Sequence, residues 1–193
     1  AQMEGKNVPR FDPDINLDHL KSRVDLNIIK SLLTFQIEGI CFAIQHNGRV
    51  LLADDMGLGK TIQGLGIASY YRSEWPLFII VPSSVKFMWK ESAKKWLTNS
   101  LNEVCDYVNL EDCIQVLENG KQSIDPECKI VIGSYDLLAK NIDEIEKVHY
   151  KVIIADESHL LKNPKASRTK AALRLIQNCN RIILLSGTPA LSR

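Results

Sequence analysis

The chain has 193 residues, of which 45% are hydrophobic and 24% charged, and its net charge is +1. This composition is that of a globular protein with a proper core, and it excludes a disordered or strongly basic chain. Any nucleic acid must therefore be bound by a local patch rather than by a general positive field. No apolar run approaches the about 20 residues that cross a bilayer, so we expect no membrane partner.

The first 27 residues are polar, contain Pro9 and Pro13, and show little periodicity. Prolines and polar residues without a repeating apolar pattern are typical of connecting segments. We therefore expect residues 1–27 to be a lead-in or linker, and residues 28–193 to form one domain.

From about Ile28 onward, short apolar runs alternate with helical patterns. The runs predict strands at Val50–Ala53, Leu77–Val81, Lys129–Gly133, Lys151–Ala155 and Arg181–Leu185, with a weaker one near Val104–Val108. The helical patterns lie at Phe35–Gln45, Thr61–Arg72, Ser84–Leu97, Glu111–Glu118 and Ala166–Gln177. Such Ile- and Val-rich runs are typical of strands buried on both faces, and the alternation predicts an α/β fold with a mostly parallel sheet flanked by helices. Ligands of such sheets bind at the carboxyl ends of the strands.

The first predicted strand leads into a glycine-rich loop that ends in Gly-Lys-Thr. Glycines allow a tight turn in which backbone N–H groups point inward, and the following helix N-terminus attracts phosphate. We expect Lys60 to reach the β- and γ-phosphates of a nucleotide and the Thr61 hydroxyl to bind Mg²⁺. The loop residues expected around the nucleotide are Asp54, Met56, Gly57, Leu58, Gly59, Lys60 and Thr61. A plain glycine turn with a surface lysine is the alternative, and the preceding strand argues against it.

The helix that follows the loop contains Gly64 and Gly66. Each glycine costs about 1 kcal/mol relative to alanine in a helix interior. Close packing against the sheet would explain them.

The predicted helix Ser84–Leu97 carries lysines at four-residue spacing, namely Lys86, Lys90 and Lys94. These lysines are interpreted equally well as a solvated face or as a contact with DNA phosphates. Trp89 and Trp96 are seven residues apart, so they share a face of the helix. For them we favour a core stripe.

The strand Lys151–Ala155 leads into Asp156 and Glu157. An acid at the end of a buried strand can bind Mg²⁺, and a second acid can activate the attacking water. We therefore expect Asp156 and Glu157 to be catalytic together with Lys60. GTP-binding switch proteins usually show Asp-x-x-Gly at this strand end and Asn-Lys-x-Asp later in the chain, and neither pattern appears at those places.

The last predicted strand leads into Leu-Ser-Gly-Thr-Pro-Ala, which ends at Ala190. Ser186 and Thr188 offer hydroxyl groups, while the glycine and proline favour a turn. One interpretation is a simple turn at a strand end. The other is a polar relay in which His159 bonds these hydroxyls and couples the nucleotide to the rest of the protein.

These three motifs, in this order, resemble those of the superfamily-two helicases and more narrowly of the Swi/Snf-like DNA translocases. The similarity to the annealing-helicase branch, the SMARCA-like or HepA-related proteins, is close. It covers about residues 32–193 and is carried by long phrases: Arg49–Gln63, Glu74–Leu77, Val81–Val85, Asp156–Leu160 and Leu184–Ala190. Thr34 departs from the family, where a proline is common.

The resemblance implies a RecA-like P-loop NTPase lobe, the first of a two-lobed motor that uses ATP and Mg²⁺. It implies that Gln36 reads the adenine base. It also implies that DNA, double-stranded or forked, is held independently of sequence through its phosphates. The residues implied in that contact are Pro82, Ser83, Ser84, Gly133 and Ser134, with Tyr135 following. A nuclear location and roles in replication-fork remodelling and DNA repair are implied as well.

We therefore expect a DNA-dependent ATPase that translocates on DNA or rewinds it. Two alternatives remain: a helicase that separates strands of DNA or RNA, and a nucleotide-binding scaffold without catalysis. A second RecA-like lobe would supply arginines to the γ-phosphate, and the sequence up to Arg193 does not include one. This chain alone is thus expected to bind ATP·Mg²⁺ weakly, to hydrolyse it very slowly and not to translocate.

The five cysteines, finally, form no C-x-x-C pair. They are Cys41, Cys105, Cys113, Cys128 and Cys179. Their odd number and their scatter predict reduced thiols inside a cell, with no chemistry assigned to any of them.

Overall fold

The computed structural model describes residues 14–53 and 59–187. In this part of the chain, six strands form one sheet in the order β1-β6-β5-β2-β4-β3, and every neighbouring pair is parallel. The strands are β1 (Arg49–Ala53), β2 (Leu77–Val81), β3 (Ile114–Val116), β4 (Ile130–Ser134), β5 (Val152–Ala155) and β6 (Arg181–Ser186). The five strands predicted with the clearest apolar runs are confirmed, and so is the α/β fold with a parallel sheet.

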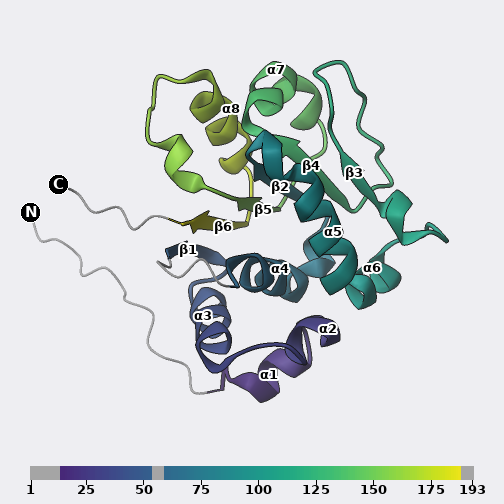
Figure 1. Cartoon of the computed structure of the whole chain (residues 1–193), viewed down its shortest axis with the longest axis vertical. Helices are drawn as coiled ribbons and strands as arrows, with labels where there is room; N and C mark the ends of the chain where they lie inside the picture. Colours follow the sequence, from purple (N-terminus) through teal and green to yellow (C-terminus); the bar gives the residue numbers. More distant parts are fainter. Residues whose placement is uncertain (1–13, 54–58, 188–193) are drawn as a thin grey trace, which may run out of the picture.

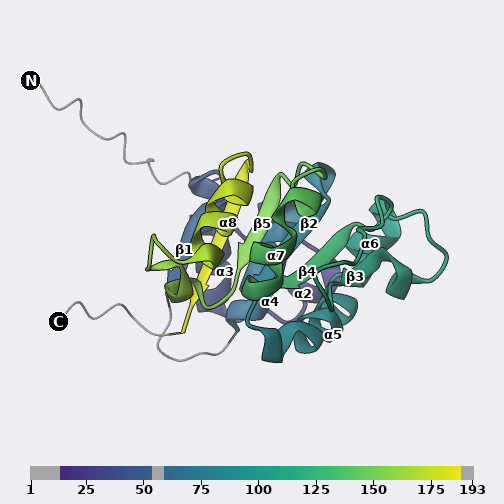
Figure 2. The same ribbon diagram turned by 90° about the horizontal axis from the view of Figure 1, so that it is seen from above.

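Helices cover both faces of the sheet, so the molecule has three layers (Figure 1). One face is covered by α3 (Thr34–Gln45), α4 (Lys60–Tyr70), α5 (Lys86–Trp96) and α6 (Thr98–Val104). The other face is covered by α7 (Tyr135–Ile145) and α8 (Ser167–Ile176), which lie over the strands in Figure 2. Along the fully buried β2, Ile79 belongs to the first core and Phe78 to the second, as alternation in a strand requires. None of the helices described is both long and apolar enough to cross a bilayer.

The region between α5 and β4 differs from the prediction. Val104 ends α6 rather than beginning a strand, and Val108 is fully exposed. The predicted helix at 111–118 is instead a 3₁₀ turn, η3 (Leu110–Cys113), followed by β3. Pairing of β3 with β4 decides the outcome, because short segments take their structure from tertiary partners rather than from local propensity. The helices α6 and α7 were not predicted.

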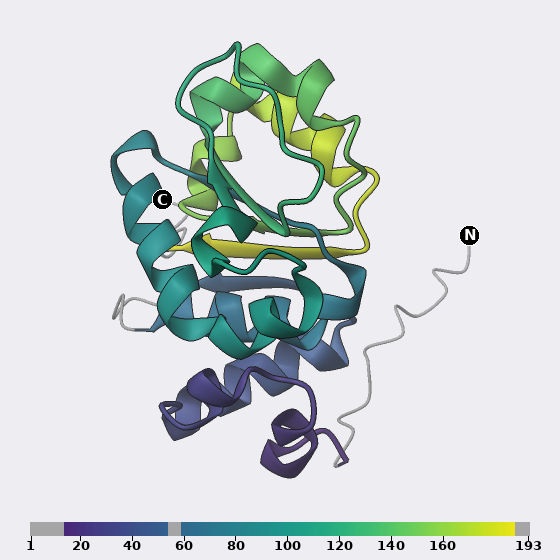
Figure 3. The ribbon, with the colours of Figure 1, turned by 90° about the vertical axis from the view of Figure 1, so that its right-hand side faces the viewer.

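The N-terminal segment is more structured than a linker. It forms two short helices, α1 (Leu17–Lys21) and α2 (Leu26–Ile29), which lie beneath α3 in Figure 3 (purple). Leu20 and Val24 are buried in the first core. Part of the predicted lead-in therefore packs on the domain, which its polar composition did not indicate. The division of the chain near residue 28 stays a prediction.

Asp25 joins this segment to the rest of the fold. Its side chain is 3% exposed and accepts hydrogen bonds from Asn27 N, Ser100 N, Ser100 Oγ and Asn99 Nδ2 at 2.7–3.1 Å. The carboxylate thus caps α2. It also accepts a hydrogen bond from a backbone N–H in the first turn of α6 that has no partner within that helix, at Ser100, 75 positions further along the chain.

We expect Asp25→Ala to destabilise the protein by about 2–4 kcal/mol, because buried donors lose their acceptor. Urea unfolding at constant pH measures this change. Asp18→Ala is the matched control: the Asp18 side chain is 91% exposed, and its loss should cost less than about 0.5 kcal/mol. Equal midpoints for the two variants would contradict the capping role of Asp25.

Two cysteines are bonded, contrary to the prediction of reduced thiols throughout. Cys105, which follows α6, forms a disulfide with Cys113 at the end of η3. Cys41, Cys128 and Cys179 are free. The spacing of Cys105 and Cys113 in the sequence matches no motif, and only the fold brings these two residues together.

The two glycines inside α4 lie against neighbouring elements. A Cβ on Gly64 would lie 3.2 Å from Leu185 Cδ1 of β6, and a Cβ on Gly66 would lie 2.9 Å from Ile40 Cδ1 of α3. Both distances are shorter than ordinary van der Waals contacts. Close packing on the sheet and on α3 therefore explains why this helix carries glycine despite its low helix propensity.

Candidate active site

The predicted motifs meet at one edge of the sheet. Because all the strands are parallel, their carboxyl ends share that edge, and each motif follows a strand. Asp156 follows β5, Gly187 follows β6, and Pro82 follows β2. The loop after β1 returns to the same edge at Gly59, where α4 begins. Of the loop, Asp54, Met56, Gly57 and Leu58 lie outside the described residues.

Gly59 and Gln36 are in close contact. Gly59 has φ +86°, in the left-handed region that glycine adopts without strain, and it immediately precedes α4. A Cβ at this position would lie 1.9 Å from Gln36 Nε2, so another residue would displace the glutamine. Gln36 is 5% exposed, and its Oε1 accepts a hydrogen bond from Leu33 N at 2.9 Å. The predicted adenine-reading residue thus lies beside the predicted phosphate loop.

Lys60 extends from the start of α4 to the end of β6. Its Nζ donates a hydrogen bond to Ser186 O at 2.9 Å. A Cβ on Gly187 would lie 3.4 Å from Lys60 Nζ and 3.5 Å from Glu157 Oε1, so both groups flank the same glycine. Three segments that are far apart in the sequence therefore bring an ammonium group and a carboxylate together. Thr61 is the second residue of α4, directly after Lys60.

Asp156 is the most enclosed acid of this cluster. Its Oδ2 accepts a hydrogen bond from Trp89 Nε1 at 3.0 Å, and its Oδ1 accepts one from Glu157 N at 3.0 Å. Burial raises the pKa of the Asp156 carboxyl, while the Trp89 hydrogen bond and the charge of Lys60 act in the opposite direction. On its other side, Tyr135 Oη donates to the Asp156 carbonyl. Neither aromatic contact was predicted, because nothing in the sequence pairs them with Asp156.

Glu157 has a left-handed backbone, with φ 50° and ψ 49°. A non-glycine residue in this region costs about 1 kcal/mol or more, and such strain is common at active sites. The turn carries the chain from β5 into the 3₁₀ turn η4 (Ser158–Leu161). His159 lies in that turn, with Nδ1 3.3 Å from Glu157 Oε2, although the orientation is not that of a hydrogen bond.

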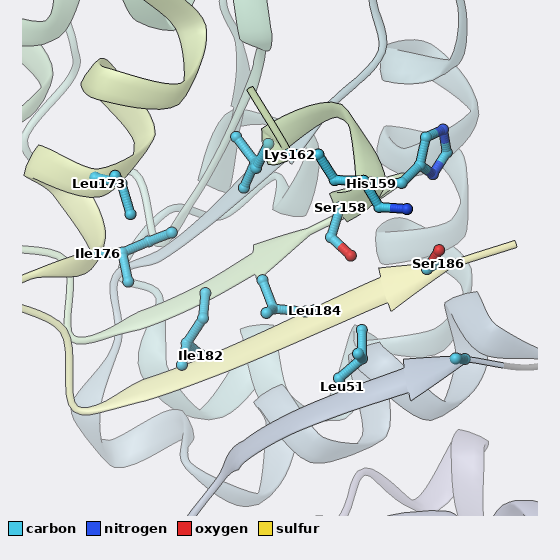
Figure 4. A pocket seen from close by; sticks show the side chains of 11 residues that line it. Leu51, Ser158, His159, Lys162, Leu173, Ile176, Ile182, Leu184 and Ser186 are labelled. Carbon is cyan, nitrogen blue, oxygen red and sulfur yellow. The ribbon is translucent and has the colours of Figure 1, made fainter. Parts of the chain in front are cut away.

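The predicted relay is only partly described. His159 and Ser186 line the same pocket of about 410 Å³, and Thr188 lies outside the described residues. Figure 4 shows the two side chains at one end of this pocket, while Leu51, Leu173, Leu184 and their neighbours line the rest. The lining is mostly aliphatic and therefore unsuited to phosphate. The charged cluster borders this pocket and does not lie in it.

The residues implied in DNA binding divide into two groups. Ser83 and Ser84 are exposed in the 3₁₀ turn η2 (Ser83–Val85), just after Pro82. Gly133 and Ser134 are buried, and the Ser134 hydroxyl accepts a hydrogen bond from Leu137 N as the cap of α7. Burial and the capping bond hold the Ser134 hydroxyl inside the fold, and its contact with DNA stays a prediction.

Two of the α5 lysines are paired with acids within the chain. Lys90 and Lys94 both pair with Glu111 of η3, at 3.2 and 3.7 Å, and Lys94 also pairs with Glu91. These ion pairs favour the solvated-face interpretation over a DNA contact. Of the two tryptophans on this helix, Trp89 is fully buried and Trp96 packs at the edge of the core, as the core-stripe interpretation predicts.

The chemical groups at this edge of the sheet fit a nucleoside triphosphate and its magnesium ion. Two adjacent carboxylates and a threonine hydroxyl are oxygen ligands of the kind Mg²⁺ prefers. Lys60 and the N-terminus of the 11-residue helix α4 supply positive charge for phosphate. Gly59 leaves space that a side chain would take from Gln36, and Gly187 lies between Lys60 and Glu157.

Comparison with known proteins agrees with this geometry. A profile of the SNF2-related domain matches residues 35–192. SWI/SNF-related matrix-associated actin-dependent regulator of chromatin subfamily A-like protein 1 of Xenopus laevis is 48% identical over 93% of this chain and 17% of its own length. The human DNA annealing helicase and endonuclease ZRANB3 is 38% identical over 94% of this chain and 16% of its own length. The chain thus spans about a sixth of the length of these relatives.

A solved structure shares the fold. The Sulfolobus solfataricus SWI2/SNF2 ATPase core in complex with double-stranded DNA superposes with a TM-score of 0.68 at 28% identity, over 84% of this chain and 33% of that one. The RecA-like fold and the resemblance inferred from the motifs are therefore confirmed. With the profile covering most of the sequence and the relatives sharing up to half of its residues, the chain belongs to the SNF2-related family.

Proposed function

We propose that this chain is the first, ATP-binding lobe of a DNA-dependent ATPase that translocates on DNA or rewinds it. The observation that carries the proposal is the convergence of Lys60 and Glu157 on Gly187, with Asp156 beside them. Groups from the ends of β5, β6 and the start of α4 then face one ligand. The names of the relatives, an annealing helicase and a chromatin regulator, support the DNA substrate and a nuclear location.

Each residue has a distinct role in the proposed hydrolysis. Lys60 binds the β- and γ-phosphates and offsets the charge that develops on them. Thr61 and Asp156 hold Mg²⁺, which supplies further positive charge to the phosphates. Glu157 accepts a proton from the attacking water and orients it. Gln36 reads the base beside Gly59, and His159, with Ser186 and Thr188, relays the state of the site.

The proposed contact with DNA is made by the segment Pro82–Ser84. Its two serines are exposed at the start of a helical segment, where hydroxyl and N–H groups suit phosphate oxygens without reading sequence. In the related structure, the SWI2/SNF2 core is in complex with double-stranded DNA. A second RecA-like lobe would hold the DNA from the other side and supply arginines to the γ-phosphate. It would belong to the remaining five-sixths of a protein as long as the relatives.

The test measures steady-state ATP turnover of the full-length protein with four ligands: double-stranded, forked and single-stranded DNA, and RNA. We expect double-stranded or forked DNA to stimulate turnover at least tenfold, because phosphate contacts order the two lobes around ATP. The stimulation should fall steeply as salt rises. Stimulation by RNA alone would instead favour a strand-separating RNA helicase, and no turnover with any ligand would favour a scaffold.

A further inference from the structure

Asp156 is held from both helical layers by aromatic side chains. Trp89, in the middle of α5, is fully buried and donates its indole N–H to Asp156 Oδ2 at 3.0 Å. Tyr135, the first residue of α7 on the opposite face, donates its hydroxyl to the Asp156 carbonyl. The remaining carboxylate oxygen, Oδ1, accepts the Glu157 N–H. The carboxylate therefore has a fixed orientation at the end of β5.

This arrangement leaves the carboxylate able to bind a cation. Each carboxylate oxygen has two lone-pair positions, and each accepts one of these two hydrogen bonds. Because Trp89 is completely shielded from solvent, water cannot easily replace its N–H if it is removed. Partners that orient a ligating carboxylate in this way typically matter about 10–100-fold for metal affinity.

We propose that Trp89 is a positioning residue for magnesium binding: its indole N–H sets the Asp156 carboxylate in the orientation that ligates the ion. This inference rests on the proposed function, in which Asp156 is a metal ligand. It assigns to Trp89 a role beyond filling the core between α5 and the sheet. Trp75 provides a comparison, since it too is buried and its N–H donates to Ala68 O. It precedes the start of β2, at the opposite edge of the sheet from Asp156.

The experiment compares Trp89→Phe with Trp75→Phe in the 193-residue chain. Both variants lose one buried indole hydrogen bond and keep an aromatic ring. Binding of Mn²⁺, used as the probe for magnesium, is measured by electron paramagnetic resonance with ADP at saturation. We expect Trp89→Phe to weaken Mn²⁺ binding about 10-fold or more, and Trp75→Phe to change it less than about 2-fold. Affinity for ADP without metal should be the same in all three proteins.

Asp156→Asn separates this inference from the proposed function. If Asp156→Asn leaves Mn²⁺ affinity unchanged, then Asp156 is not a ligand and the proposed function fails. If Asp156→Asn weakens binding but Trp89→Phe and Trp75→Phe behave alike, the metal site stands and the role of Trp89 is overturned.

A spectroscopic measurement on the unmutated chain keeps the inference testable even if Trp89→Phe does not fold. The three tryptophans give three indole signals in a ¹H–¹⁵N spectrum. Addition of Mg²⁺ to the ADP-bound chain should shift the Trp89 signal, because its acceptor gains a cation, and should leave the Trp75 signal in place. An unchanged Trp89 signal at saturating Mg²⁺ would overturn the proposal.

Discussion

Replacing Glu157 by Gln is expected to lower ATP turnover of the full-length protein about 10²–10⁴-fold while leaving ATP affinity within a few-fold. The amide keeps the size of the side chain, and therefore its place beside Gly187 and His159. It cannot accept a proton from water, so the chemical step slows and binding does not. Turnover under saturating ATP and DNA, together with the affinity for a fluorescent ATP analogue, measures both quantities.

Lys60→Ala should produce a different pattern. Removing the ammonium group removes the positive charge that stabilises both the bound nucleotide and the transition state. Affinity for ATP and turnover should therefore both fall, turnover by about 10²–10³-fold. Glu144→Gln and Lys147→Ala are matched controls, because these residues form an exposed ion pair at the C-terminal end of α7, away from the cluster. They should retain full turnover. If Glu157→Gln and Lys60→Ala both kept the basal rate, the assignment of the site would be wrong.

The sequence was sufficient to predict those parts of the candidate site that directly follow strands. Buried parallel strands appear in the sequence as apolar runs, and their carboxyl ends share one edge of the sheet. The sequence therefore predicted that Lys60 and Asp156 lie near each other. The family resemblance, rather than any pattern in the residues, implied that Gln36 belongs to the site, and its contact with Gly59 was not predicted. The roles of these residues in binding ATP stay predictions.

What the sequence did not predict depends on contacts between distant segments. Asp25 looks like an ordinary polar residue of a linker, yet it accepts a hydrogen bond from Ser100 N in the first turn of α6, 75 positions away. Trp89 fits a core stripe, and nothing in its spacing indicates a hydrogen bond to Asp156. The segment between 104 and 118 has weak local preferences, so pairing with β4 determines its structure. In each case the deciding partner is remote in the chain.

The largest effect should come from separating this chain from the rest of the protein. We expect the 193-residue chain alone to hydrolyse ATP about 10³–10⁵-fold more slowly than the full-length protein with DNA, which is the range attributed to an arginine finger. The described arginines have partners elsewhere: Arg168 donates to Leu160 O, Arg174 pairs with Asp143 and Glu146, and Arg181 pairs with Glu74. Their positions suit folding rather than contact with a γ-phosphate.

Single-turnover hydrolysis, with each protein in saturating excess over ATP·Mg²⁺, provides the measurement, since it removes differences in affinity between the two proteins. The full-length Glu157→Gln variant gives the baseline rate of hydrolysis for a site that binds ATP but lacks its general base. The chain alone should retain weak, Mg²⁺-dependent binding, because Lys60, Asp156 and Glu157 belong to it, and DNA should not accelerate its turnover. Rapid, DNA-stimulated hydrolysis by this chain alone would mean that one lobe contains the complete catalytic machinery, and the requirement for arginines from a second lobe would have to be abandoned.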